Sequence, residues 1–309
     1  MSVTDLLQLP PDPIYDRRRT VQTMAAASIR RRKLRNRIFT GSIIACLVVA
    51  LVPLFFVLLT IIEKGISAIT WGFITKTPVQ PTIFAQNNIG GVGNAIVGTL
   101  VIVGLAAVLA IPVGIIVSIY LAESDNKIAN SFRAVIEILT GLPSILLGVF
   151  AYSYIVLTTH TYSGWAGSFA LAILMIPVIT KASENAIRSV PATLTEAGLS
   201  LGARSSTVIR KVVVPAAAPG IITGVLLGLA RAIGETAPVL LVIGASLNFE
   251  FNPLHPMPAL PTTIYNYAGS AYASQRTAAW GVAFILVVLV LALSLGSRLI
   301  SARMRKERH

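Results

Sequence analysis

Six stretches of apolar residues, each close to or longer than twenty residues, dominate this sequence of 309 residues. An α-helix needs about 20 apolar residues to cross the hydrocarbon layer of a bilayer, so each stretch can span a membrane. The composition agrees, because 55% of the residues are apolar and 12% are charged, against about 25% charged in soluble domains. The sequence therefore predicts an all-α membrane protein with six transmembrane helices, near residues 38–62, 92–121, 132–156, 165–183, 216–244 and 278–298.

Lysine and arginine residues fall almost entirely on one side of these predicted spans. Short cytoplasmic loops of membrane proteins are enriched in such residues. Of the 25 basic residues, 21 lie in the N-terminal arm, two alternate loops and the tail, whereas Lys64, Lys76 and Arg276 lie in the opposite loops and Arg231 lies within a span. This asymmetry predicts a multi-pass protein of a bacterial cell membrane with both termini in the cytoplasm. Because no soluble basic domain exists, nucleic acid is excluded as a partner and membrane lipid is expected.

The chain divides into one membrane domain with a basic segment at each end. Residues 1–37 are polar and rich in arginine, without the pattern of a packed core, so we expect a largely disordered cytoplasmic arm. The first apolar run is longer than the apolar part of a signal peptide, so it should be retained. A single transmembrane domain is then expected over 38–302, followed by a basic cytoplasmic tail at 303–309.

The remaining polar residues give no pattern of an enzyme or a metal site. The single cysteine, Cys46, has no intrachain partner, and the three histidines are scattered over two loops and the C-terminus. No intramembrane Ser–His or paired-Asp arrangement is present, so we expect no catalytic residue, no metal and no other cofactor. Two larger external segments, 63–91 and 245–277, are rich in proline, which favours irregular loops that an extracytoplasmic partner can contact.

The longest internal cytoplasmic stretch, 184–215, has the pattern of two short helices joined by a turn. Pro191 suits a first helical turn, and an apolar stripe follows at helical spacing (Leu194, Ala197 and Leu201). Gly202 is expected to end this helix, and Ser205 or Ser206 to cap the next one. On this pattern alone, a connector packed against the membrane surface and a docking element remain equally good interpretations.

The residues of this loop resemble a known signature. Glu196, Ala197 and Gly198 are followed after three residues by Gly202, and after nine more by Val-x-Val-Pro ending at Pro215. The spacing is that of the Glu-Ala-Ala loop of ABC importer permeases, with small or aliphatic exchanges at three positions. In that family the loop forms a coupling helix that docks on a separate ATPase subunit. The resemblance therefore implies a type I ABC importer permease fold and assigns these five residues to the ATPase-coupling loop.

Two further segments resemble one particular group of ABC importer permeases. Residues 137–145 (Glu-Ile-Leu-Thr-Gly-Leu-Pro-Ser-Ile) and 230–238 (Ala-Arg-Ala-Ile-Gly-Glu-Thr-Ala-Pro) are similar to segments of PstA-type permeases, the membrane subunits of bacterial ABC phosphate importers. The resemblance implies four kinds of partner: a second homologous permease subunit (PstC-like), two ATPase subunits (PstB-like), an extracytoplasmic phosphate-binding protein (PstS-like) and membrane lipid. The absence of any Gly-x-x-x-x-Gly-Lys-[Ser/Thr] pattern agrees with ATP hydrolysis in a partner subunit.

Three ionisable residues lie within predicted spans: Glu137, Arg231 and Glu235. A charge at the centre of a membrane helix costs about 2.5–3.5 kcal/mol, so each needs a partner or a watery cavity. Arg231 and Glu235 are four residues apart and can simply neutralise each other. Alternatively, all three line the substrate pathway, where guanidinium binds a phosphate oxyanion and a carboxylate accepts the phosphate's hydroxyl proton. A permease for sulfate or molybdate, and a gradient-driven secondary transporter, remain alternative functions.

Overall fold

The computed structural model describes residues 13–79 and 90–306, and every regular element in these ranges is a helix. Five helices are long and apolar enough to cross a membrane, and a bent pair of helices supplies a sixth crossing if it is one span. The chain separates into two compact units, 1–60 and 61–309. Each unit is therefore described by itself.

The first unit consists of helix α1, Pro13–Ala68, whose last eight residues belong to the second unit. The sequence predicted a largely disordered arm over residues 1–37, but residues 13–37 are helical and continue without interruption into the first apolar span. Residues 1–12 lie outside the described residues. Alanine and arginine are strong helix formers, and the run Ala25-Ala26-Ala27 lies in this stretch. Pro13 fits the first helical position, where its missing N–H costs nothing.

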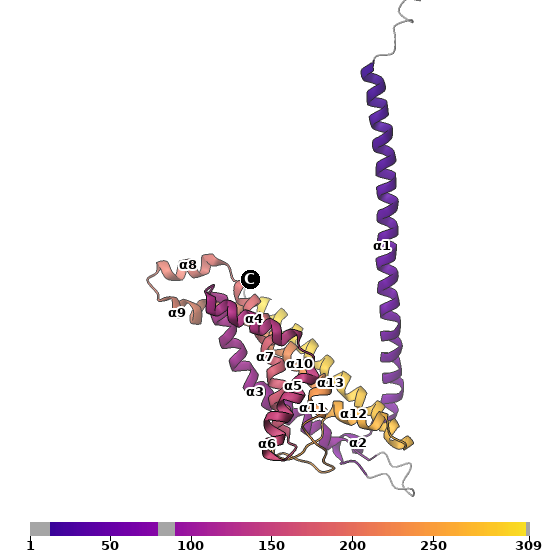
Figure 1. Ribbon diagram of the computed structural model, residues 1–309, viewed down its shortest axis with the longest axis vertical. Coiled ribbons are helices and arrows are strands. Elements are labelled where there is room, and N and C mark those ends of the chain that lie inside the picture. The colour runs from indigo at the N-terminus through magenta and orange to yellow at the C-terminus, as the bar shows by residue number, and fades with distance from the viewer. Residues whose placement is uncertain (1–12, 80–89, 307–309) are drawn as a thin grey trace, which may run out of the picture. The chain divides into compact units, whose positions relative to one another are not determined.

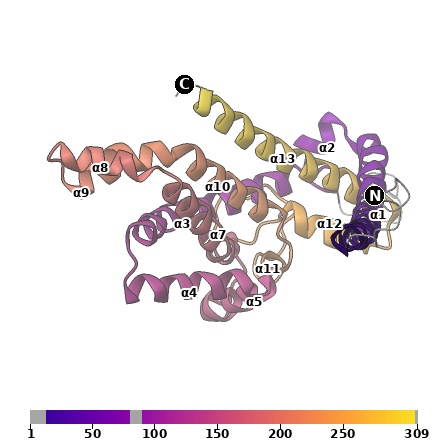
Figure 2. The same cartoon turned by 90° about the horizontal axis from the view of Figure 1, so that it is seen from above.

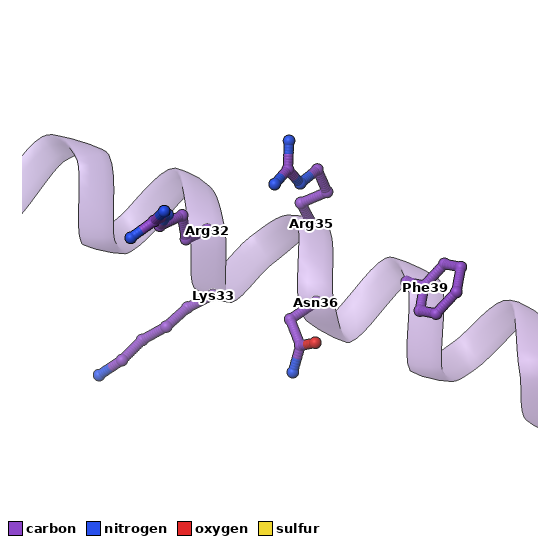
Figure 3. Close-up of a pocket in the computed structure, with 5 residues that line it drawn as sticks. All are labelled: Arg32, Lys33, Arg35, Asn36 and Phe39. Carbon is purple, nitrogen blue, oxygen red and sulfur yellow. The ribbon is translucent and has the colours of Figure 1, made fainter.

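A shallow hollow on α1 is lined by Arg32, Lys33, Arg35, Asn36 and Phe39 (Figure 3). All five residues belong to the same stretch of one helix, and the labelled side chains project outward from it. Because one helix alone bounds the hollow, it is a depression between long exposed side chains, and it forms no enclosed site.

The second unit is built around helix α7, Gly164–Arg188, whose apolar window is 67% buried. Helix α3, Gly93–Glu123, packs along one side of α7, and helix α10, Val214–Gly234, along another (Figures 1 and 2). Helix α13, Ala273–Lys306, packs on α10 and continues through the expected tail as far as Lys306. The core where these helices meet contains mainly small and aliphatic side chains, including Ala106, Met175 and Ile179.

Small residues allow the close approach of these helices. A Cβ atom on Gly114 of α3 would lie 2.8 Å from Ile179 Cγ2, and one on Gly224 of α10 would lie 2.6 Å from Ala182 Cβ. Gly220 and Gly228 also face α7, so glycines at every fourth position of α10 form a row against that helix. Such rows favour helix association in membranes, because backbones come close enough for extensive van der Waals contact.

The third predicted span, 132–156, is wrong as a continuous helix. Helix α4, Lys127–Gly141, and the helical segment that starts with α5, Ser144–Ala151, meet at an angle of 100°. Leu142 is extended (φ −69°, ψ 137°) and precedes Pro143. Proline has no N–H to donate and disfavours the helical conformation of the residue before it, which favours a break here. A π-helical segment, Tyr152–Val156, and helix α6, Leu157–Thr159, complete this part of the chain.

The fifth predicted span, 216–244, is also shorter than expected at its end. The helix stops at Gly234, and Glu235 is extended (φ −74°, ψ 126°). A four-residue helix, α11 (Ala237–Leu240), follows. Pro238 lacks an N–H to continue the α10 ladder, and Gly244 turns the chain with φ +70°. The helix begins earlier than predicted, because α9, Ser205–Val208, and a π-helical segment, Ile209–Val213, run directly into α10.

Hydrogen bonds identify the two ends of this unit. At one end, Arg188 Nη2 donates to Leu121 O (2.9 Å), so α3 and α7 both finish there. At the other end, Asn94 Nδ2 donates to Ser246 O (2.9 Å) and Ser163 N donates to Val242 O (3.0 Å), so both helices begin there. The bent pair α4–α5 lies between them in sequence and returns the chain across the unit, as alternate crossings require.

The two segments expected to be irregular external loops contain short helices. Helix α2, Trp71–Thr75, lies in the first segment, of which 80–89 are outside the described residues. Helix α12, Leu260–Ala268, lies in the second. Phe73 of α2 is buried against Gly281 of α13, where an added Cβ would lie 2.8 Å from the phenyl ring. These segments are therefore packed onto the bundle.

Candidate functional site: the exposed loop and the intramembrane charges

The loop after α7 forms the expected pair of short helices. Helix α8, Ala192–Ser200, starts four residues after α7 ends, and α9 starts five residues after α8 ends. Gly202 has φ +79°, and its N–H donates to Leu199 O (2.9 Å). A left-handed residue at a helix end is most easily glycine, since a Cβ is strained there. The sequence prediction that Gly202 ends this helix is confirmed.

Helix α8 buries none of its residues within this chain. Leu194, Leu199 and Leu201 are all exposed, and Leu201 is 88% exposed. Of the five predicted loop residues, Glu196 and Ala197 are exposed, whereas Gly198 packs on Val208 of α9, where an added Cβ would lie 2.9 Å from Cγ2. Exposed leucines on a short helix outside the bundle mark a surface that another protein can cover.

One local prediction for this loop differs from the structure. Neither Ser205 nor Ser206 caps α9, because Arg204 occupies the N-cap position and no side chain bonds there. Pro215 lies in the first turn of α10, within a helical stretch that runs from Ser205 to Gly234.

Arg231 and Glu235 approach each other at the end of α10. The distance from Arg231 Nε to Glu235 Oε1 is 3.5 Å, at the limit of a hydrogen bond. The Arg231 side chain is 49% exposed and that of Glu235 is 17% exposed. The pair expected from the i,i+4 spacing therefore forms, but it is long, and about half of the Arg231 side-chain surface stays accessible to another group.

Glu137 lies elsewhere. Its side chain faces a hollow of ≈ 280 Å³ between α4 and α7, which is also lined by Arg133, Lys181, Glu184 and Arg188. Neither Arg231 nor Glu235 lines this hollow. Within this chain, the structure brings Arg231 and Glu235 together but does not join Glu137 to them.

Sequence reasoning missed the charged cluster beside Glu137. Arg133, Glu184, Arg188 and Asp125 are bound to one another by four ion pairs of 2.9–3.4 Å. The only local signal was the i,i+4 spacing of Glu184 and Arg188, because Arg133 counted simply as a basic loop residue. Hydrogen bonds from the Arg133 and Arg188 guanidinium groups hold the pKa of the Asp125 carboxyl below its usual value.

The helical bundle with its exposed two-helix loop defines a class of protein, the membrane subunits of importers. The family model described as "Binding-protein-dependent transport system inner membrane component" matches residues 110–306. Two solved structures share the fold. One is the MetNI methionine ABC transporter in inward-facing conformations (TM-score 0.53, 25% identity, 69% of this chain and 94% of that chain). The other is a bacterial alginate ABC transporter (TM-score 0.62, 14% identity, 87% and 96%).

Sequence comparison with known proteins shows to which group of importer subunits the chain is most similar in sequence among these relatives. The phosphate transport system permease protein PstA of Haemophilus influenzae is 36% identical over 87% of this chain and 94% of its own length. PstA 1 of Mycobacterium tuberculosis is 36% identical (87% and 90%), and a probable PstA of Methanocaldococcus jannaschii is 34% identical (85% and 92%). The chain belongs to the PstA-type permeases within the family of binding-protein-dependent inner membrane components. It is an ABC permease subunit and not itself an enzyme, since the ATPase of such a transporter is a separate subunit.

Proposed function

We propose that this chain forms part of the membrane pathway through which an ATP-driven importer moves inorganic phosphate into the cell. The observation that carries the proposal is the agreement among relatives from distant organisms, which are all named phosphate transport system permeases and align along most of this chain. Its partners are a second homologous permease subunit, two ATPase subunits and an extracytoplasmic phosphate-binding protein. The 21 basic residues on one side favour cytoplasmic termini.

The loop 184–215 is proposed as the docking element for the ATPase. Its residues Glu196, Ala197, Gly198, Gly202 and Pro215 have the spacing of the family signature. Leu194 and Leu199 of α8 are 44% exposed, and Leu201, directly after α8, is 88% exposed. On the topology proposed above, α8 faces the cytoplasm, where an ATPase lies. Full burial of an exposed leucine contributes about 1.5–3 kcal/mol, so Leu201 would contribute most to this contact and the two half-covered leucines less.

Arg231 is proposed as the residue that contacts the anion, with Glu235 beside it. A guanidinium presents five N–H donors in a fixed fork that matches phosphate oxygens, and among the described residues it makes a long hydrogen bond to Glu235. Glu235 can accept a hydrogen bond from the hydroxyl of a protonated phosphate, whereas sulfate offers none at neutral pH. Glu137 is proposed to lie on the same pathway nearer the cytoplasm, since α4 adjoins the end of α7 that precedes the coupling loop.

Uptake of radiolabelled phosphate by proteoliposomes that contain the whole transporter tests this function. Phosphate uptake that depends on ATP and is not inhibited by excess sulfate or molybdate supports it. Competition by either oxyanion would favour a different ABC oxyanion permease, and uptake driven by an ion gradient without ATP would favour a secondary transporter.

Variants of Arg231 test the pathway assignment separately. Hydrogen bonds to charged groups are worth about 1.5–3 kcal/mol, so Arg231→Ala should lower phosphate uptake about 10- to 150-fold while the complex still assembles. Arg231→Lys keeps the charge without the planar fork and should transport partially. If Arg231 only neutralises Glu235, the double change Arg231→Leu with Glu235→Gln will restore uptake, since no unpaired charge remains. Full uptake by that double variant would remove Arg231 from the pathway.

A further inference from the structure

We propose that Arg133, Glu184, Arg188 and Asp125 form a latch that transmits movement of the coupling loop to the bent helix pair α4–α5. The proposal rests on the function proposed above, because it assumes that the loop 184–215 docks on an ATPase. The four residues come from α4, the end of α7 and the α3–α4 connection. They act as positioning residues, since none of them needs to touch the transported anion.

Glu184 is the centre of the latch. One of its carboxylate oxygens, Oε1, accepts hydrogen bonds from Arg133 Nε on α4 (3.4 Å) and from Arg188 Nε on α7 (3.1 Å). The Glu184 side chain is only 14% exposed. A carboxylate that is shared by two guanidinium groups on different helices fixes the distance between those helices more strictly than a single surface ion pair does.

The Arg133 guanidinium also binds the end of α3. Its Nη2 atom donates to Leu121 O (2.7 Å), to Ser124 O (3.0 Å) and to the Asp125 carboxylate (2.9 Å). Arg188 Nη2 donates to the same Leu121 carbonyl (2.9 Å). The last carbonyl groups of a helix have no partner within the helix, so two cations satisfy them here. The ends of α3 and α7 are thereby bound to α4 as one block.

The position of this block gives it a mechanical consequence. The coupling helix α8 begins four residues after Arg188 ends α7, so a shift of α8 pulls directly on the latch. On the other side, α4 ends at the bend formed by Leu142 and Pro143. The latch and the short connection to α8 make α4 follow a movement of α8. The bend at Pro143 is then the hinge where the angle between α4 and α5 can change.

Beyond the bend, α5 contacts the segment that follows the intramembrane charges. A Cβ atom added to Gly148 of α5 would lie 2.6 Å from Pro238 Cα of α11, so the two backbones are in close contact. Pro238 is three residues after Glu235. A rotation of α4 that moves α5 would therefore shift the backbone next to Arg231 and Glu235. Without the latch, α8 could move while α4 stays in place.

The latch predicts a loss of coupling that differs from a loss of assembly. In proteoliposomes with the complete transporter, Arg133→Gln and Glu184→Gln should each retain the ATPase subunits. The phosphate imported per ATP hydrolysed should fall at least about fivefold, the lower limit of a typical coupling free energy. The double variant should be no worse than the more affected single variant, because both changes break the same block. The control variant is Arg298→Gln, which removes an exposed arginine in the C-terminal part of α13. It should keep the wild-type ratio of phosphate imported to ATP hydrolysed.

The ratio of import to hydrolysis tests the latch separately from the proposed function. If the wild-type complex imports phosphate but the assembled variants keep its import-to-hydrolysis ratio, the latch is wrong and the function stands. A parallel fall of import and hydrolysis also overturns the latch, since it indicates damaged assembly. Arg133→Lys, which keeps the cation but loses the fork, should give an intermediate ratio.

A second measurement keeps the four latch residues unchanged, so its result does not depend on whether variants of those residues fold. Cysteines at the exposed residues Ser131 of α4 and Ser189 after α7, in a Cys46→Ala background, carry spin labels. The distance between the labels should be the same with and without bound nucleotide, since the latch moves as one block. A nucleotide-dependent change in this distance would overturn the proposal.

Discussion

The contact between α10 and α7 gives a quantitative test of the packing. An alanine at Gly224 places its Cβ 2.6 Å from Ala182 Cβ, whereas carbon atoms in contact lie about 3.5–4.0 Å apart. The helices must therefore separate by about 1 Å at this point. Overpacking of this kind costs about 1–3 kcal/mol, and the higher helix propensity of alanine returns about 1 kcal/mol.

Gly104 is the matched control for Gly224, because it lies within α3 and a Cβ added there has no neighbour within 4 Å. Gly104→Ala should gain the same propensity without a clash, so the difference in the free energy of unfolding between the two variants isolates the packing cost. We expect Gly224→Ala to be less stable than Gly104→Ala by about 1–3 kcal/mol in denaturant unfolding of the purified complex.

Exchanging the two residues completes the test. Gly224→Ala together with Ala182→Gly keeps one methyl group at the contact, so the double variant should recover to within about 1 kcal/mol of the wild type. Equal stability of Gly224→Ala and Gly104→Ala, or a double variant less stable than Gly224→Ala, would refute the close contact.

Two further predictions concern the loop and the topology. Gly202→Ala should leave the chain in the membrane but weaken co-purification of the ATPase, because a left-handed conformation costs a residue with a Cβ about 1–2 kcal/mol. Gly202→Leu adds a bulky side chain and should weaken co-purification further. Wild-type import by both variants would contradict the coupling role. Cysteines at Ser205 and Ser270, in a Cys46→Ala background, should differ in intact cells, with only Ser270 labelled by an impermeant thiol reagent. Labelling of both from outside would disprove the proposed orientation.

The sequence by itself determined the features that depend on local composition. Apolar runs of sufficient length identified the membrane helices, because the bilayer requires every spanning segment to be helical and apolar whatever its neighbours are. Gly202 was also identifiable, since a left-handed turn selects glycine locally. The small residues Gly220, Gly224 and Gly228 indicated a packed face, and they do contact α7.

Positions where apolar segments stop or bend were harder to predict. Hydropathy does not distinguish a straight helix from a bent pair, so the apolar runs 132–156 and 216–244 did not show the break before Pro143 or the end of α10 at Gly234. A proline within a membrane helix produces either a mild kink or a full break, depending on which neighbours satisfy the freed backbone groups. Pro112 lies inside α3 without ending it.

Tertiary structure alone decided which charges on different helices meet. Arg133 and Glu184 are 51 residues apart, and only the packing of α4 on α7 brings their atoms to 3.4 Å. Glu137 was grouped by sequence with Arg231 because both lie within apolar spans, yet the helices place it beside Lys181 and Glu184. Local patterns fix which segments are helical, because propensity and hydropathy act over one or two turns. The pairing of distant side chains depends on helix directions and bends, which packing across the whole unit determines.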